Sequence, residues 1–365
     1  MLRNTEWIIL ICSIILFAIG LVALFTATQE SGYSEFRKQI IWFAISIPVV
    51  IAVMLIDYNI IARFSWFFYL FFVALLVGVL FTKPINGATS WFEITDTLRF
   101  QPSELAKIFV IMFLSTVIVK IQENGKENIN RFSRLLLVGL VIGVPLLLII
   151  KQPDFGTAMA FIVSTILIMF VAGIDKKYII ALAAIVIVSV PLAYMYVLPE
   201  HAKTRIDVFL NPNLDPRGSG YNIIQSKLAI GAGQLFGMGL LKGNQTQLGY
   251  LYPKTTDFIF SVIGEELGFL FAGAVILLYV VMITKAMQVA KTAKNDLGSY
   301  IAMGIAGIFL FHMLENIGMT MGLLPITGVP LPFVSYGGSS LITNFMCIAM
   351  LLNISARRQK TIFMN

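Results

Sequence analysis

Long apolar runs alternate with shorter polar segments along most of the chain. A bilayer core of about 30 Å needs roughly 17–25 apolar residues per helix. The runs near that length are residues 7–25, 39–56, 64–82, 102–119, 135–150, 155–174, 178–198, 258–284, 300–324 and 335–354. The pattern therefore predicts an all-α polytopic integral membrane protein with about ten transmembrane helices.

Lys and Arg residues are unevenly distributed among the loops between these runs. With the N-terminus inside, the short outer loops hold only Arg37, Lys38, Lys83, Arg99 and Lys151. Because positive residues are retained on the cytoplasmic side, we expect both termini in the cytoplasm. The segments then predicted to lie outside are residues 83–101, 151–154, 199–256 and 325–336.

The longest polar segment, residues 199–257, separates the seventh and eighth predicted spans. Connections of this length are generally functional or disordered. This one carries turn-forming residues at 211–220, a helix-capable piece at 221–230 and a glycine-rich piece at 231–239. We expect it to fold back onto the outer face of a single transmembrane domain covering residues 1–365.

The composition agrees with a membrane protein and excludes several other classes. Hydrophobic residues make up 58% of the 365 and charged residues 12%, about half the charged share of a soluble domain. Disordered, coiled-coil, collagen-like and nucleic-acid-binding chains are excluded, since the net charge of +7 reflects cytoplasmic Lys and Arg. Cys12 and Cys347 lie in apolar runs, which predicts buried thiols rather than a disulfide.

Asp257 lies where the long loop enters the eighth predicted span. Thr255 or Thr256 could cap that helix, which would place Asp257 in its first turn. A carboxylate there could simply complement the helix dipole. Alternatively, it could act as a base at the outer membrane surface. Position alone favours the first interpretation.

Two pairs of ionisable residues within predicted spans admit both structural and functional interpretations. Glu104 and Lys107 are three residues apart and meet on one helix face, either as an internal ion pair or to present Lys107 to an anionic substrate. Glu265 and Glu266 lie roughly 12 Å below the start of their helix. Ionisable groups at that depth usually face a bundle interior or a wet cavity.

Further candidates lie at the ends of spans or within them. His312 and Glu315 could form a helix–helix hydrogen bond, a proton relay or a metal pair, and two ligands are too few to predict a metal site. Asp154 sits where it would cap the sixth span. Trp91, in the first outer loop, is of the type that anchors at a membrane interface.

Several longer motifs occur together and in a fixed order. They are Gln101-Pro-Ser-Glu-Leu105, Gln152-Pro-Asp-Phe-Gly-Thr157, Gly218-Ser-Gly-Tyr221, Gln225-Ser-Lys-Leu-Ala-Ile-Gly231, Thr256-Asp-Phe-Ile-Phe260, Glu265-Glu-Leu-Gly268, Asn316-Ile-Gly-Met-Thr320 and the run from Leu323 to Ser340. Taken together, they resemble the SEDS family, the RodA/FtsW/SpoVE group, over nearly the whole chain. Gln225-Ser-Lys and residues 243–248 look closer to RodA than to FtsW.

The chain departs from the family pattern at two places. It has Thr255-Thr-Asp where the family often has His-Thr-Asp, so a histidine role before the aspartate is absent. Its first outer loop lacks the basic residues that often precede the tryptophan, unless Arg99 substitutes for them.

The resemblance implies a glycosyltransferase that polymerises lipid II into β-1,4 glycan strands at the outer face of the bacterial cytoplasmic membrane, for cell elongation and shape. It implies a class B penicillin-binding protein as transpeptidase partner, with other elongation-complex membrane proteins. The family's catalytic aspartate corresponds to Asp257, which overturns the interpretation from position alone. No nucleic acid and no tightly bound cofactor is expected, although Mg²⁺ or Mn²⁺ could assist.

An inverting transfer from a diphosphate donor needs one base and stabilisation of the leaving group. We expect Asp257 to take the proton from the acceptor hydroxyl, and cationic side chains to meet the diphosphate. The residues expected at the substrate are Glu104, Lys107, Trp91, Arg99, Asp154, Arg205, Gln225, Lys227, Lys242, Glu266 and Ser335.

Other functions remain open on the sequence. Buried glutamates and interrupted spans are also features of transporters, so a lipid II flippase is the main alternative. A division or sporulation paralogue of the FtsW or SpoVE type, or a non-catalytic scaffold, would share much of the pattern.

Overall fold

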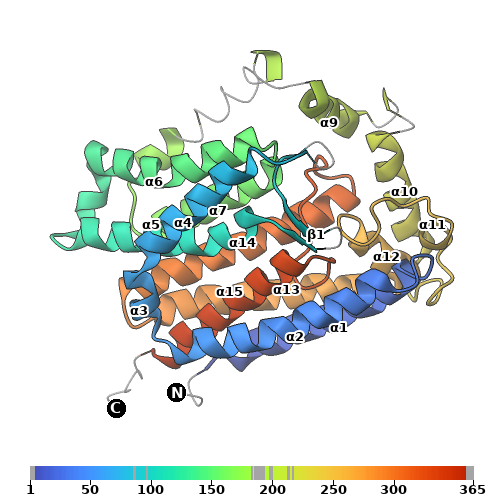
Figure 1. The fold of residues 1–365 in the computed structure, drawn as a ribbon, viewed down its shortest axis with the longest axis horizontal. Helices are drawn as coiled ribbons and strands as arrows, with labels where there is room; N and C mark the ends of the chain where they lie inside the picture. The colour runs from blue at the N-terminus through green and yellow to red at the C-terminus, as the bar shows by residue number, and fades with distance from the viewer. Residues whose placement is uncertain are drawn as a thin grey trace.

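The computed structural model is helical almost throughout (Figure 1). The residues that the structure describes are 5–84, 88–95, 98–181, 184, 194–196, 200–211, 214–215 and 218–358. The helices of the first half are α1 (Trp7–Ala27), α2 (Ser34–Leu55), α3 (Tyr58–Arg63), α4 (Ser65–Val79), α5 (Pro102–Gln122), the 3-10 helix η2 (Lys126–Asn130), α6 (Phe132–Lys151) and α7 (Phe155–Val171). The helices of the second half are α9 (Glu200–Leu210), α10 (Ser219–Ala232), α11 (Asn244–Gln247), α12 (Ile259–Glu266), α13 (Gly268–Thr292), α14 (Asp296–Thr320) and α15 (Gly338–Ala356).

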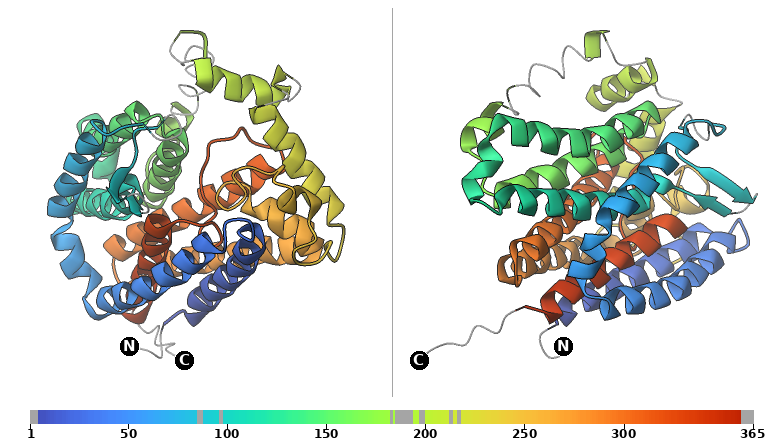
Figure 2. Two further views of the ribbon diagram at one scale, coloured as in Figure 1. Left: turned by 45° about the vertical axis from the view of Figure 1, so that its right-hand side comes forward. Right: turned by 60° about the vertical axis from the view of Figure 1, so that its left-hand side comes forward.

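Helix α14 lies at the centre of the bundle. It packs against α5 and α7 on one side and against α13 on the other, while α15 packs chiefly against α2. In Figure 2, α4 to α7 form one group of helices, and α1, α2, α13 and α15 form a second group beside it. Most side chains of α14 are buried, so it is the element against which the others are positioned.

The apolar side chains of the outer helices point away from the protein. In α2 the buried residues are the polar Gln39 and Ser46, whereas Ile41, Ile51 and Leu55 are more than half exposed. A soluble protein rarely exposes an apolar surface of this extent, but a lipid-facing helix must. This inverted pattern fits the predicted membrane protein.

The predicted spans correspond to helices wherever the structure describes them. Among the described residues, six helices are long and apolar enough to cross a membrane, namely α1, α2, α6, α13, α14 and α15. The shorter apolar helices α4 and α7 match two further runs, and α5 matches the run at 102–119. The predicted seventh span, residues 178–198, lies mostly outside the described residues. The fold class is therefore confirmed as an all-α polytopic membrane protein.

The predicted eighth span is two helices rather than one. Helix α12 ends at Glu266, and α13 begins at Gly268, whose φ of +79° is in the left-handed region. The backbone of residues 235–237 lies directly against Gly268, so that a Cβ there would collide with it. Expecting a continuous helix was wrong, because hydropathy does not register a single left-handed glycine.

The two ends of the bundle carry different segments. At one end Arg357 pairs with Asp57 at 3.2 Å, and Arg358 pairs with Glu6 at 2.8 Å. At the other end the four segments predicted to lie outside come together, as the contacts of the candidate site show below. Figure 1 places α3 at the first end and α10, α11, α12 and β1 at the second. The segments predicted to lie outside are thus at one end of the bundle, and those predicted to be cytoplasmic are at the other.

The long loop folds back onto the bundle, as expected. Its helix α10 packs against α12 and α14. Glu265, fully buried, accepts hydrogen bonds from the backbone N–H groups of Gln245 (2.7 Å) and Thr246 (3.0 Å). Glu266 accepts from Leu241 N at 3.2 Å and from Gln247 Nε2 at 2.7 Å. The two carboxylates thus anchor the loop.

Within the part of the chain that the structure describes, one small sheet interrupts the helical fold. Strands β1 (Phe92–Thr95) and β2 (Leu98–Phe100) pair antiparallel, with Phe92 opposite Phe100 and Glu93 opposite Arg99. The hairpin projects from the bundle in the right-hand view of Figure 2. It leads directly into α5 and positions the start of that helix.

The break between α12 and α13 generates a stability prediction. Gly268→Ala should lower the free energy of unfolding by at least about 1–2 kcal/mol, because a side chain is disfavoured at positive φ and collides with the loop. The matched control is Gly273→Ala within α13, where a Cβ meets nothing within 4 Å. Thermal unfolding in detergent measures both variants, and equal melting temperatures would contradict the prediction.

Candidate functional site

Four segments that are distant in sequence meet at one end of the bundle. Gln101, before α5, donates from its side-chain amide to Asp154 at 3.1 Å, and its backbone N–H donates to Ser339 Oγ at 3.3 Å. Ser90 Oγ donates to Gln152 O at 3.4 Å. Tyr336 N donates to Thr255 O at 2.9 Å. These bonds join the hairpin segment, the start of α7, the start of α15 and the segment before α12.

Asp257 lies in the turns before α12 and not in its first helical turn. The helix begins at Ile259, and Phe258 occupies the N-cap position without a side-chain cap. The expected capping by Thr255 or Thr256 is therefore wrong. The reason is tertiary, because the backbone carbonyls of residues 255–257 accept bonds from α14 and from the loop that follows it.

The loop of residues 325–336 holds this segment in place. Ser335 Oγ donates to Thr256 O at 2.6 Å and accepts from Leu331 N at 2.8 Å. Gly328 has a φ of +75°, and a Cβ there would lie 3.4 Å from Asp257 Oδ2, so the carboxylate lies beside this glycine. Asp257 itself is partly exposed. The result is an accessible carboxylate on a backbone fixed by buried bonds.

The side chain of Ser335 was expected at the substrate. It is 5% exposed, and both of its hydrogen bonds are to backbone groups within the site. The geometry therefore favours a structural role for this hydroxyl.

A face of α14 binds the same loop. Asn316 Nδ2 donates to Asp257 O at 3.0 Å and to Val329 O at 2.9 Å. Glu315 accepts from Thr327 Oγ1 at 2.7 Å. His312 Nδ1 lies 2.9 Å from Pro330 O. Of the alternatives open for His312 and Glu315, these contacts favour hydrogen bonding between segments.

Glu104 and Lys107 form the internal ion pair that their spacing allowed. Lys107 Nζ lies 2.9 Å from Glu104 Oε1 and 3.1 Å from His312 Nε2. Both charged side chains are at most 2% exposed. Because the ammonium is buried and doubly engaged, the geometry favours the structural interpretation over contact with a diphosphate.

Asp154 caps α7, as expected. Its Oδ1 accepts from Thr157 N at 3.1 Å, while Oδ2 accepts from Gln101. Desolvation raises the pKa of this carboxyl above its ordinary value of 3.8, although the bonds from Thr157 oppose the shift. Its contacts tie the start of α7 to the start of α5.

The remaining predicted substrate residues are spread over the same end. Arg99 pairs with Glu93 across the hairpin at 3.2 Å, with both side chains about half exposed. Trp91 and Gln225 are partly buried, and Lys242 is exposed. Arg205 belongs to α9, but its side chain lies outside the described part of the chain. Glu266 anchors the long loop, which favours a structural role over contact with substrate.

Lys227 is exposed on α10 and lies across the end of α14. Its ammonium group lies against the backbone of Gly322, which has a φ of +67°. Gly322 lies two residues past the end of α14 and six past Asn316, whose side chain is bonded to Asp257 O. Of the predicted cations, Lys227 is thus placed towards the Asp257 segment.

Sequence reasoning missed two residues that organise the site. Asn316 was read only as part of a motif, although its spacing of four from His312 places both on one helix face. Gln39, fully buried in α2, donates from Nε2 to Ser335 O at 3.0 Å and accepts from Gly337 N at 3.2 Å. A glutamine at the start of an apolar run was the available signal.

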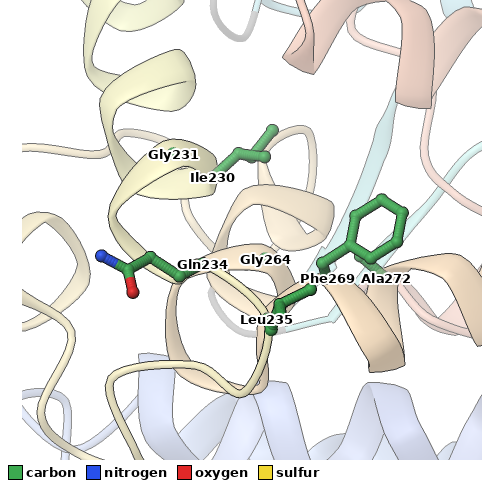
Figure 3. Close-up of a pocket in the computed structure, with 7 residues that line it drawn as sticks. All are labelled: Ile230, Gly231, Gln234, Leu235, Gly264, Phe269 and Ala272. Carbon is green, nitrogen blue, oxygen red and sulfur yellow. The ribbon is translucent and has the colours of Figure 1, made fainter.

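A separate groove of about 450 Å³ lies where α10 meets the break between α12 and α13 (Figure 3). It is lined by Ile230, Gly231, Gln234, Leu235, Gly264, Phe269 and Ala272. None of these seven residues has a titratable side chain, so they supply no acid–base chemistry to this groove. Within the described residues, no group of three or more His, Cys, Asp or Glu side chains could hold a metal ion.

Comparisons with known proteins agree over nearly the whole chain. The family model for cell cycle proteins of the FtsW, RodA and SpoVE type matches residues 6–360. A probable peptidoglycan glycosyltransferase FtsW of Trichlorobacter lovleyi is 36% identical, over 97% of this chain and 94% of the relative. The peptidoglycan glycosyltransferase RodA of Treponema pallidum is 30% identical, over 97% and 98%.

A solved structure shares the fold. A chain from a peptidoglycan synthase complex, described as coordinating polymerization and crosslinking, aligns with a TM-score of 0.84. The alignment covers 98% of this chain and 99% of that chain, at 24% identity. At 24% identity, this similarity is evidence for a shared fold only.

The capping carboxylate of Asp154 generates a prediction on pH dependence. Because its pKa is raised on folding, the folded chain binds this proton more tightly than the unfolded chain. The free energy of unfolding should therefore fall as the pH rises from 3.8 towards the raised pKa. Asp154→Asn keeps an oxygen acceptor for Thr157 N and should remove this fall. Thermal unfolding between about pH 4 and about pH 7 measures it.

The control for this prediction is Asp154→Ala. It removes the cap as well as the titrating group, so relative to Asp154→Asn it should be about 1 kcal/mol less stable throughout that pH range. An Asn variant with the same pH dependence as the wild type would refute the assignment of the slope to Asp154.

Proposed function

The chain belongs to the FtsW/RodA/SpoVE family, and on that basis we propose that it is a glycosyltransferase that polymerises lipid II into glycan strands. Relatives covering nearly its whole length carry the name peptidoglycan glycosyltransferase. The observation that carries the proposal is Asp257, a partly exposed carboxylate on a backbone held by Asn316 and by the loop at 325–336. A fixed, accessible carboxylate has the properties of a general base.

Asp257 acts as the base in an inverting transfer. Its carboxylate takes the proton from the acceptor sugar hydroxyl as that oxygen attacks the anomeric carbon of the donor. The bond from the anomeric carbon to the diphosphate oxygen breaks, and the diphosphate leaves with the electron pair. One base is sufficient, because the diphosphate needs charge neutralisation rather than protonation.

Lys227 is the leading candidate to neutralise that charge. It is exposed, and its ammonium lies against Gly322 at the end of α14, whereas Lys107 is buried with Glu104 and His312. Lys242, exposed, and Arg99, about half exposed, are further candidates. A divalent cation that arrives with the diphosphate could add to this charge.

The site faces the outer side of the bacterial cytoplasmic membrane, and both termini face the cytoplasm. This orientation is supported by the excess of Lys and Arg in the loops of the other end. The ion pair of Arg357 with Asp57 and that of Lys126 with Asp296 belong to that cytoplasmic end.

The enzyme interpretation is supported over a flippase by the contacts of the buried glutamates. A transporter would need such groups for a substrate or a coupling ion at the midplane. Glu265 and Glu266 instead accept hydrogen bonds from backbone and side-chain groups of residues 241–247. Their acceptor capacity is used within the protein.

The partner is a class B penicillin-binding protein that crosslinks the new strands. This proposal is supported by the fold shared with a chain of a synthase complex that coordinates polymerization and crosslinking. We assign the chain to elongation rather than division because Gln225-Ser-Lys and residues 243–248 resemble RodA. The FtsW relative is 36% identical to this chain and the RodA relative 30%, so the assignment depends on these motifs and not on overall identity.

The base assignment predicts the effect of Asp257→Asn. The variant should lower the rate of lipid II polymerisation at least about 100-fold, since a positioned general base contributes that much or more. Binding of lipid II should change little, because the amide keeps the shape of the carboxyl group. The measurement is polymerisation of labelled lipid II by the purified protein with its partner, with moenomycin present to inhibit unrelated polymerases.

The matched control is Glu30→Gln, which removes an exposed carboxylate whose partner, Lys254, lies near the end of the long loop. It should polymerise at the wild-type rate. Near-normal glycan synthesis by Asp257→Asn would contradict the base assignment. If both variants were inactive, the loss of activity would follow from removing any carboxylate charge and not from removing the base.

The cation assignment predicts the effect of Lys227→Gln. Loss of one charged contact should lower kcat/KM for lipid II roughly 10- to 100-fold. Lys227→Arg should stay within about threefold of the wild type, because the charge is retained. Lys285→Gln, at the opposite end of the bundle beside Glu6, is the control and should leave kcat/KM unchanged. Equal activity of the Gln and Arg variants would exclude Lys227 from this role.

A further inference from the structure

Three buried polar residues of α14 bind one loop. His312, Glu315 and Asn316 are 1%, 5% and 0% exposed, and their spacing of three and four places them on one helix face. Their partners, Thr327, Val329 and Pro330, lie within a stretch of four residues of the loop. Burying polar side chains inside a membrane protein costs free energy, so a polar helix face there indicates a structural or functional role.

The hydrogen bonds of His312 determine its tautomer. An ammonium has only donors, so Nε2 must accept from Lys107 Nζ at 3.1 Å. The ring proton is then on Nδ1, which donates to Pro330 O at 2.9 Å. Both contacts are satisfied at once only by the neutral ring with the proton on Nδ1. Lys107, paired with Glu104, thus fixes the direction in which His312 donates.

The loop that receives this bond is the one that holds Asp257. Asn316 Nδ2 bridges Val329 O and Asp257 O, and Ser335 Oγ donates to Thr256 O. Pro330 lies between Val329 and Ser335, so its carbonyl anchors the loop between the two points that contact the Asp257 segment. A shift of Pro330 would therefore move the carboxylate.

We propose that His312 is a positioning residue for Asp257, acting through its hydrogen bond to Pro330 O. The ion pair of Glu104 with Lys107 sets the tautomer of His312. His312 in turn fixes the position of the loop at residues 325–336 relative to α14. The inference rests on the proposed function, because positioning has a catalytic consequence only if Asp257 is the base. A misplacement of about 1 Å can cost about 100-fold in rate.

Two substitutions separate the two hydrogen bonds of His312. In His312→Asn the amide nitrogen lies near the place of Nδ1 and can still donate to Pro330 O. In His312→Gln the longer side chain reaches the place of Nε2 and can accept from Lys107, but it gives up Pro330. The proposal predicts a kcat at least about 10-fold lower for the Gln variant and within about threefold of the wild type for the Asn variant. KM for lipid II should stay within about threefold in both.

A purely structural role makes a different prediction. The Gln variant loses a neutral hydrogen bond, worth about 1 kcal/mol, whereas the Asn variant loses the bond from the Lys107 ammonium, worth about 1.5–3 kcal/mol. If kcat followed stability, the Asn variant would be impaired at least as much as the Gln variant, which is the opposite of the order that the proposal predicts. Tyr300→Phe is the control, because it removes the bond from Tyr300 Oη to Gln122 Oε1 (2.6 Å) at the other end of α14 and should leave kcat unchanged.

The assay uses the full-length protein with its partner and labelled lipid II, and it includes Asp257→Asn. Equal kcat for the Asn and Gln variants, or a loss expressed in KM, would overturn the proposal for His312. An active Asp257→Asn would overturn the proposed function and the inference together. An inactive Asp257→Asn beside a fully active His312→Gln would overturn the inference alone. If His312→Gln does not fold, His312→Ala replaces it with the same expectation.

Discussion

The side-chain amide of Asn316 joins two segments on which the candidate site depends. Its nitrogen donates to Asp257 O and to Val329 O, which are 59 and 13 positions away in the sequence. An amide nitrogen has two N–H donors, and both are used here. The segment before α12 and the loop after α14 are thereby held side by side. The contacts of Ser335, Tyr336 and Gly328 with residues 255–257 all presuppose this arrangement.

The cost of polar groups within a membrane protein explains how the charged residues are divided. No water is available to them in the bilayer core, so each must find a partner within the protein. Glu265 and Glu266 bind the long loop, and Lys107 binds Glu104 and His312. The buried charges are therefore used to fix segments relative to one another. Asp257 differs from them because it is partly exposed.

Some of the fold follows directly from hydropathy, and some does not. Apolar runs locate α1, α2 and α6, because a helix that contacts lipid must be apolar over its length. The break at Gly268 escaped this reasoning, because its cause is the backbone of residues 235–237 lying against it. Asp257 was wrongly placed in a helical turn because its position also depends on a tertiary contact. Its carbonyl is bonded to Asn316, a contact that no local pattern contains.

The membrane class, the positions of most helices and, through the motifs, the family could all be read from the sequence. Those properties depend on composition and on residues close together in the chain. The structural role of the buried charged residues and the partial exposure of Asp257 follow only from the packing of the folded chain. They do so because burial and hydrogen-bond partners depend on segments far apart in sequence, such as His312 with Lys107, 205 positions away. The same residue types thus serve the scaffold or the chemistry according to what surrounds them.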